Sequence, residues 1–295
     1  MLFDWVSDLH ISHWKGEWGT DADGNQRKMC KKKNETWLDW SELKNPGSEL
    51  LIIGGDTANH CSSTIELIRQ AAKHYDKIFA IDGNHEYYEG FKRNYKIIYS
   101  LLEIEFVDEA DIKFGKVSEV IGNTAFVGCM GWYDWQMMCP EYTRQQQFEA
   151  WNNDRYIRYE VLPPKLAERD KAWLQAEIVK FKADPAIAKI VVFTHTVPVR
   201  KGLMHGYGPQ FDIQSGSYGN SLMREIVKMP DSKINYWLFG HSHVKNDFVE
   251  YGIRFIQAPR GYRIDDLNWQ RPIQIDTEAP IIGSAFGEIE IDPIT

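Results

Sequence analysis

Short apolar runs rich in β-branched residues recur along the chain, as is typical of buried strands. Amphipathic patterns, with apolar positions three and four residues apart, lie between them and predict helices. The predicted strands cover residues 2–6, 50–53, 78–81, 124–129, 190–193, 236–239, 253–257 and 285–291. The predicted helices cover residues 63–74, 91–102, 165–181 and 220–228. The alternation predicts an α/β fold, and no repeat or change in composition divides residues 1–295 into more than one domain.

Two polar stretches interrupt this pattern and read as loops of unusual length. Residues 12–34 carry glycine, aspartate, asparagine and lysine, and residues 200–219 carry five glycines. Long loops in a compact domain are often lids or binding loops, although a tolerated surface insertion has the same composition. Both interpretations stay open for each loop.

Composition and charge narrow the class of protein. With 295 residues, 43% of them hydrophobic, the chain can bury a large core without disulfides. The net charge of −8, with one basic cluster at residues 27–33, argues against tight binding to long nucleic acid. Four cysteines without a CxxC pair indicate free thiols in a reducing cytoplasm. Because a strand is predicted at residues 2–6, we expect no leader. No apolar run approaches the ~20 residues that span a bilayer.

Polar motifs follow five of the predicted strands, and they contain five of the nine histidines. In chain order they are Ser7-Asp8-Leu9-His10, Gly54-Gly55-Asp56-Thr57-Ala58-Asn59, Gly83-Asn84-His85-Glu86, Thr194-His195 and Gly240-His241-Ser242-His243. Open α/β sheets bind their ligands at the carboxyl ends of their strands, where each of these motifs falls. We therefore expect the motifs to meet in space.

The residue types of these motifs point to transition metals. Asp, Asn and neutral His are hard or borderline ligands that suit Mn, Fe, Zn or Ni. A single histidine at a strand end is more often a hydrogen-bonded structural residue, so no motif is informative alone. Five such motifs in one chain, each directly after a strand, predict a metal site.

Taken together, these motifs resemble those of the calcineurin-like metallophosphoesterases, and the resemblance spans residues 8–243. The resemblance implies a four-layer αββα sandwich, with two sheets packed face to face and helices outside. The segment Ala258-Pro259-Arg260-Gly261-Tyr262 is similar to one found after the last ligand motif in a bacterial subgroup of this superfamily. Many relatives have a second histidine after His195, where this chain has Thr196.

The resemblance also implies a division of roles among the site residues. The first metal would be held by Asp8, His10, Asp56 and His243, and the second by Asp56, Asn84, His195 and His241. Asp56 would bridge the two metals, and His85 would face the substrate without binding metal. His85 would then stabilise charge or protonate the leaving group, the alternative being that it only holds its loop.

The predicted function is hydrolysis of a phosphate ester or phosphodiester, small or nucleotide-type, by a hydroxide that bridges two metals. His60 and Arg260 are candidate substrate contacts. Alternatively, His60 lies behind the metal ligands, and Arg260 only pins a turn by hydrogen bonds. Several aromatic residues near the motifs would stack on a nucleobase or simply pack: Trp14, Trp18, Tyr87, Tyr88, Trp132, Tyr133, Tyr207 and Tyr262. The alternatives are a DNA or RNA exonuclease on the same fold and a non-catalytic scaffold that binds a partner.

Overall fold

The computed structural model describes residues 1–14, 17–20, 26–29, 38–59, 61–88, 110–137, 142–150, 157, 161–205, 208–209, 215–262, 265 and 267–281. Two mixed β-sheets form its centre. The first sheet has the strand order β15-β1-β4-β5-β6. Its strands are β1 (Leu2–Val6), β4 (Leu50–Gly54), β5 (Lys77–Ile81), β6 (Asp111–Phe114) and β15 (Ile273–Asp276). All neighbours are parallel except β15, which pairs antiparallel with β1.

The second sheet has the order β13-β14-β12-β9-β8-β7. Its four inner strands are parallel: β8 (Thr124–Cys129), β9 (Lys189–Thr194), β12 (Ile234–Phe239) and β14 (Ile253–Gln257). The two edge strands, β7 (Val117–Ile121) and β13 (Asn246–Glu250), run antiparallel to their neighbours. Parallel strands of both sheets therefore present their carboxyl ends for motif loops.

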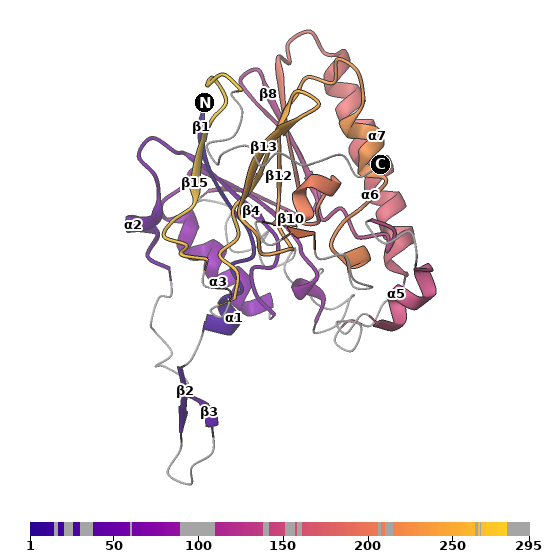
Figure 1. The fold of residues 1–295 in the computed structure, drawn as a ribbon. Helices are drawn as coiled ribbons and strands as arrows, with labels where there is room; N and C mark the ends of the chain where they lie inside the picture. The colour runs from indigo at the N-terminus through magenta and orange to yellow at the C-terminus, as the bar shows by residue number, and fades with distance from the viewer. Residues whose placement is uncertain are drawn as a thin grey trace.

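Alternating side chains of the strands divide the core into layers, because successive strand residues point to opposite faces. Phe3, Ile52 and Phe79 of the first sheet pack against Phe126 and Phe193 of the second, between the sheets. The outer face of the first sheet packs on α3 (Cys61–Ala72), and that of the second on α6 (Pro163–Ala183) and α7 (Met223–Val227). Figure 1 shows these helices on opposite sides of the paired sheets. The predicted four-layer α/β sandwich is confirmed.

Shorter helical segments lie in the connections between the strands. They are α1 (Ile11–Trp14), α2 (Trp40–Leu43), α5 (Arg144–Ala150), η1 (His85–Tyr87), η3 (Arg200–Leu203) and η4 (Ser215–Ser217). Among the described residues, no helix is long and apolar enough to cross a membrane.

Seven of the predicted strands are present, with ends that differ by at most two residues. The eighth predicted strand, at 285–291, and the predicted helix at 91–102 lie outside the described residues. The helix expected at 220–228 is shorter, because only Met223–Val227 is helical. The sequence prediction missed β6, β7, β13 and β15, all of which are edge strands of mixed polarity. Their polar positions face solvent, which removes the continuous apolar run.

The two long loops contain structure that the sequence prediction did not include. Residues 12–34 contain the end of α1 and a hairpin of β2 (Glu17–Thr20) and β3 (Gln26–Met29), which extends away from the sheets in Figure 1. Residues 200–219 contain η3, η4 and a two-residue ladder of β10 (Met204–His205) with β11 (Gly208–Pro209). The expectation of irregular loops was therefore wrong in these parts.

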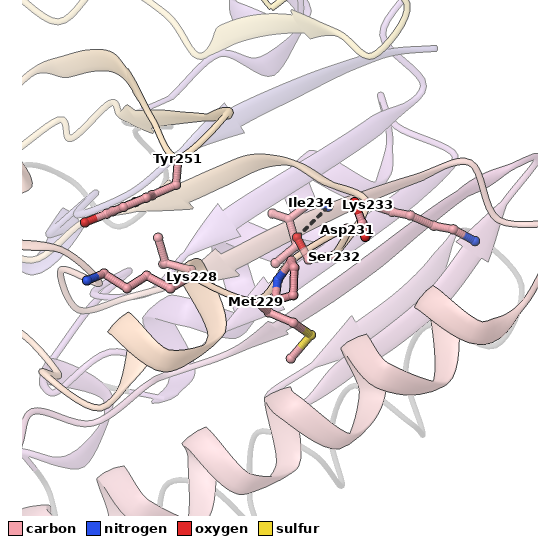
Figure 2. A pocket seen from close by; sticks show the side chains of 9 residues that line it. Lys228, Met229, Asp231, Ser232, Lys233, Ile234 and Tyr251 are labelled. Atoms are coloured by element: carbon pink, nitrogen blue, oxygen red, sulfur yellow. Dashed lines mark hydrogen bonds between the residues drawn. The ribbon is translucent and has the colours of Figure 1, made fainter.

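An open pocket of about 550 Å³ lies at the amino end of β12, between the end of α7 and the turn after β13. Figure 2 shows Lys228 and Tyr251 at one side of this pocket and Lys233 at the other. Lys228 Nζ lies 5.5 Å from the centre of the Tyr251 ring, and Lys233 Nζ donates to the carbonyl of Asp184. We call it the amino-end pocket after its place on β12. The motif histidines follow the opposite, carboxyl end of the same strand.

Candidate metal centre

The predicted motifs meet where the carboxyl ends of the parallel strands of the two sheets come together. Backbone hydrogen bonds join the loops: Asp8 N donates to the carbonyl of Gly55, and His10 N donates to that of Asp56. Gly240 N donates to the carbonyl of His195, which links the loops after β12 and β9. Each motif side chain is thus carried by a loop fixed at a strand end.

The first group of side chains consists of Asp8, His10 and His243, whose potential ligand atoms lie within 4.8 Å of one another. His10 Nε2 is 2.7 Å from His243 Nε2, and His243 Nε2 is 3.5 Å from Asp8 Oδ1. Asp8 and His10 are fully buried, and the His243 side chain is 14% exposed. These three residues could hold one metal ion.

The second group consists of Asp56, His195 and His241, again within 4.8 Å. His195 Nε2 lies 3.1 Å from His241 Nδ1 and 3.4 Å from Asp56 Oδ2. Asn84 Oδ1 is 3.3 Å from the same nitrogen of His195. All four side chains are buried, and they form a second place that could hold a metal ion.

Asp56 lies between the two groups. Its Oδ2 is 3.4 Å from His195 Nε2 in the second group and 3.7 Å from His10 Nε2 in the first. Burial opposes its charge, but the neighbouring His195, His85 and His10 hold the pKa of Asp56 well below its usual range. A carboxylate in this position can contact ions in both groups.

The charge balance of the buried carboxylates fits bound cations. Within the described part of the chain, every ion pair of Asp8 and Asp56 is with a histidine, and none is with lysine or arginine. Buried carboxylates need a compensating charge, because moving an isolated anion out of water is very costly. Oxygen and imidazole donors without thiolates suit Mn, Fe, Zn or Ni, so the residues fit the expected metals.

The backbone of the motif loops adopts a conformation that side chains other than glycine seldom take. Five predicted site residues have positive φ angles: Asp8 (52°), His10 (43°), Asp56 (52°), His241 (71°) and His243 (51°). Each such residue costs on the order of 1–3 kcal/mol, and strain of this kind clusters at functional sites. The left-handed backbone turns each of these side chains out of the strand direction and toward the centre.

Glu86 holds two of the motif loops together. Its carboxylate accepts hydrogen bonds from the backbone N–H groups of Asp56 (3.0 Å), Thr57 (2.7 Å) and Gly83 (2.7 Å). A Cβ at residue 83 would collide with the Asp56 carboxylate, so only glycine allows this approach. Burial and the nearby charge of Asp56 raise the pKa of Glu86 to about 8. Glu86 is therefore a brace for the Asp56 loop.

Hydrogen bonds on the far side of each imidazole orient three of the histidines. His195 Nδ1 donates to the carbonyl of Gly54 (2.8 Å), and His241 Nε2 donates to that of Ser217 (3.0 Å). His243 Nδ1 donates to Asp265 Oδ2 (2.7 Å). A metal-binding histidine usually carries such an outer partner, which fixes its tautomer. In each ring the other nitrogen is left facing the centre.

These surroundings shift the histidine pKa values in different directions. Burial lowers the pKa of His241 to about 3, with the neighbouring His195 adding to the effect. Burial also opposes charge on His195 and His243. However, Asp56 raises the pKa of His195 to about 9, and Asp265 with Asp8 raises that of His243 to about 10. Protons and metal ions therefore compete for these two rings.

His85 lies beside both groups. Its Nδ1 donates to Asn59 Oδ1 (2.7 Å), while its Nε2 is 3.7 Å from Asp56 Oδ2. The hydroxyls of Tyr88 and Tyr262 lie 3.1 Å and 2.9 Å from the same Nε2. Burial lowers the pKa of His85 to about 4. The ring presents one nitrogen to the space in front of Asp56.

The sequence prediction gave no role to His13, which lies at the edge of this space. Its ring is 5.8 Å from those of His10 and His85, and its Nε2 is 3.3 Å from Asn59 Nδ2. His10, His13 and His85 form a third combination that could hold a metal ion. The spacing of three residues after His10, about one helical turn, is a signal that would have indicated this proximity.

The sequence prediction also missed Asp265, because this residue follows all the motifs and belongs to none. A sequence gives no distance between residues 243 and 265, so only the fold could reveal the carboxylate behind His243.

Thr196 stands in the place of the second histidine of many relatives. Its hydroxyl donates a hydrogen bond to the carbonyl of Gly131. The side chain is buried, so the hydroxyl serves the protein's own backbone.

The two candidate substrate contacts have different outcomes. His60 lies outside the described residues. The Arg260 side chain is buried, with its guanidinium 5.5 Å from the centre of the Trp269 ring. Burial lowers the pKa of Arg260 to about 10. Its position over Trp269 favours the pinning of a turn, and its contact with substrate stays a prediction.

The aromatic residues near the motifs divide between packing and the open side of the centre. Trp132 and Tyr133 are almost fully buried and pack with Tyr87, and the Tyr133 ring stacks on His241 at 6.0 Å. Tyr88 and Tyr262 are only partly buried. Trp14, Trp18 and Tyr207 fall where the structure does not describe side chains. Among the described candidates, stacking on a base therefore stays a prediction for Tyr88 and Tyr262 alone.

Comparison with solved structures finds the same fold in one protein and a weaker likeness in another. The phosphopantetheinyl hydrolase of Mycobacterium tuberculosis aligns with a TM-score of 0.68 at 14% identity, over 96% of this chain and 98% of that one. A proposed 5′-nucleotidase from Staphylococcus aureus aligns with a TM-score of 0.46 at 14% identity, over 88% of this chain and 49% of that one. Among curated protein sequences, none matches significantly.

Comparison with sequence families gives a match to one family over most of the chain. The sequence description of the calcineurin-like phosphoesterases matches residues 1–245, which include all five motifs. The similarity of residues 258–262 to a bacterial subgroup stays a prediction, because the match ends before them. The chain belongs to the calcineurin-like phosphoesterases, a family of enzymes that hydrolyse phosphoesters.

Proposed function

We propose that this enzyme hydrolyses a small or nucleotide-type phosphoester with two metal ions that share Asp56. The observation that carries the proposal is the position of Asp56 Oδ2, 3.4 Å from His195 Nε2 and 3.7 Å from His10 Nε2. One buried carboxylate is thus within reach of both ligand groups. The absence of lysine and arginine from its described ion pairs supports a site built for cations.

The roles of the ligands follow from the two groups. Asp8, His10 and His243 would hold the first ion, with Asp56 shared. His195 and His241 would hold the second, together with Asn84 Oδ1, which lies 3.3 Å from His195 Nε2. When bound, the ions would supply an activated water as nucleophile and neutralise charge on the phosphoryl oxygens.

His85 would act on the substrate from beside the metals. Asn59 holds its Nδ1 by a 2.7 Å hydrogen bond, which turns Nε2 toward the space in front of Asp56. From there the ring can donate a hydrogen bond to the leaving-group oxygen or to the transferring phosphoryl group once it carries a proton at Nε2. The burial of the ring keeps bulk water from competing with such a bond.

Two further observations bear on substrate size and domain structure. The net charge of −8 supports a small substrate over long nucleic acid. The likeness to a protein named phosphopantetheinyl hydrolase, at 14% identity, shows the fold and leaves the substrate open. We also propose that residues 1–295 form one domain, since β15 pairs with β1 and Asp265 reaches the ligand His243.

Metal analysis combined with reporter hydrolysis tests the proposed function. Protein reconstituted with Mn or Fe should bind about two metal ions per chain by inductively coupled plasma mass spectrometry. The loaded protein should hydrolyse p-nitrophenyl phosphate or its bis-ester, and chelation should abolish the activity. Faster cleavage of a single-stranded oligonucleotide would favour the exonuclease alternative. Full metal loading without any hydrolysis would favour the scaffold alternative.

A further inference from the structure

Residues beyond the family match complete the open side of the centre. After β14, the chain turns back so that Arg260 N donates to the carbonyl of Ser7 and Gly261 N donates to that of Asp8. Gly261 has φ of +73°, and a Cβ there would lie 2.8 Å from Asp265 Oδ2. A larger residue would strain this turn, which delivers Tyr262 to the first metal group.

The ring of Tyr262 covers three histidines at the centre. Its centroid lies 4.3 Å from that of His10, 4.6 Å from that of His243 and 4.7 Å from that of His13. Its hydroxyl is 2.9 Å from His85 Nε2, the nitrogen that faces Asp56. The phenol oxygen therefore stands at the place where an oxygen bound to His85 would be.

Two hydroxyls approach this single nitrogen. His85 Nε2 can take part in one good hydrogen bond in its ring plane, yet Tyr262 and Tyr88 lie 2.9 Å and 3.1 Å away. Tyr88 stacks on His85, with ring centres 4.1 Å apart, and its hydroxyl also accepts from Asn84 Nδ2 (3.4 Å). The Tyr262 hydroxyl can rotate from His85 to another acceptor while the ring stays in place.

One carboxylate fixes both Tyr262 and a candidate ligand. Asp265 Oδ2 accepts from the backbone N–H of Tyr262 (2.6 Å) and from His243 Nδ1 (2.7 Å). The position of the Tyr262 backbone is thus tied to that of the His243 imidazole. This shared hydrogen-bond acceptor fixes the position of the Tyr262 phenol relative to the first metal group.

We infer that Tyr262 contacts the substrate and that its hydroxyl donates a hydrogen bond to a phosphoryl oxygen beside His85. The inference rests on the proposed function, because it assumes that a phosphoryl group lies in front of Asp56. When the anion binds, the Tyr262 hydroxyl would exchange its hydrogen bond to His85 Nε2 for one to a charged phosphoryl oxygen. A hydrogen bond to a charged acceptor is stronger than one between neutral groups.

Tyr262→Phe tests this inference, because it keeps the ring over His10 and removes only the hydroxyl. Inorganic phosphate binding to the metal-loaded protein, measured by calorimetry, should weaken by on the order of tenfold. Turnover of the reporter that the wild-type enzyme hydrolyses should fall similarly, while metal content stays at the wild-type value. Tyr251→Phe is the matched control, since Tyr251 is 52% exposed at the other end of β14 and should change neither quantity.

The outcomes separate this inference from the proposed function. Wild-type phosphate affinity in Tyr262→Phe would overturn the inference and leave the proposed function intact. Loss of metal from Tyr262→Phe would also overturn it, because the tyrosine would then act through the ligands. If the wild-type enzyme hydrolyses no reporter, the proposed function fails, and the phosphate measurement still decides whether the hydroxyl contacts an anion.

Discussion

The two ends of β12 have one backbone feature in common yet differ in chemistry. Both have strained backbone: Asp231 and Lys233 at the amino end have φ of 49° and 59°, and His241 and His243 beyond the carboxyl end have 71° and 51°. The amino-end pocket is open, and its charged groups, such as Lys228, lie at the surface. Beyond the carboxyl end, the charged groups are buried and face one another.

This difference shows which features indicate function. A left-handed backbone occurs at both ends, and the pocket lies at the amino end, away from the motifs, so neither feature is sufficient evidence. The carboxyl end adds buried carboxylates without lysine or arginine partners in the described chain and imidazoles oriented by outer hydrogen bonds. These features cost stability unless a cation compensates them, whereas the lysines of the amino-end pocket remain solvated.

The largest effect is expected from Asp56→Asn, which removes the buried charge shared by both groups. A neutral amide cannot balance two cations, so metal content should fall toward one ion or fewer per chain. Turnover should drop about 10³-fold, as when electrostatic stabilisation of a transition state is lost. Steady-state kinetics and metal analysis of the same preparation check both effects. Near-normal rates in this variant would place the reaction away from the carboxyl end.

A second test separates ligands from substrate contacts within one loop. His85→Ala should keep both metals and slow turnover by about 10²-fold, within the usual contribution of general acid catalysis. The loss should be largest for an alkyl ester, whose leaving group needs a proton, and smallest for p-nitrophenyl phosphate. Asn84→Ala, one residue earlier, should instead weaken metal binding in the second group. If His85→Ala strips metal and Asn84→Ala does not, the two roles are reversed.

The sequence predicted the central strands and the motifs that follow them, because both depend on local patterns. Five strand ends carry the motifs as expected, and the fold brings Asp8 to His243 and Asp56 to His195. The sequence named Tyr262 only as an aromatic residue near the motifs, and it gave no sign of Asp265, because a turn with a positive φ at Gly261 brings both to the centre. Nor could it predict that Glu86 braces the Asp56 loop, since that contact depends on tertiary packing.

A third prediction concerns pH and follows from the competition between protons and metals. The pKa of His195 is raised to about 9 and that of His243 to about 10. Below pH 8 and without metal, both rings therefore carry a second proton and are positively charged. Each metal should then displace about one proton, so its apparent affinity should rise about tenfold per pH unit from pH 6 to 8. Manganese titrations at several pH values measure this slope. A flat profile would mean that the two rings are not ligands.

The smallest effect is expected at the amino-end pocket, where Lys228→Ala removes a charge opposite the metal centre. Lys228 is exposed, and its ammonium group lies 5.5 Å from the centre of the Tyr251 ring. An exposed cation–π contact contributes about 0.5 kcal/mol, so the free energy of unfolding should fall by no more than about that amount. Metal content and turnover should stay within about twofold of wild type, since surface substitutions seldom act at a distance. Chemical denaturation and the reporter assay measure the two quantities. A tenfold change in turnover would show that the two ends of β12 are coupled, and the contrast between a catalytic end and a structural end would then be wrong.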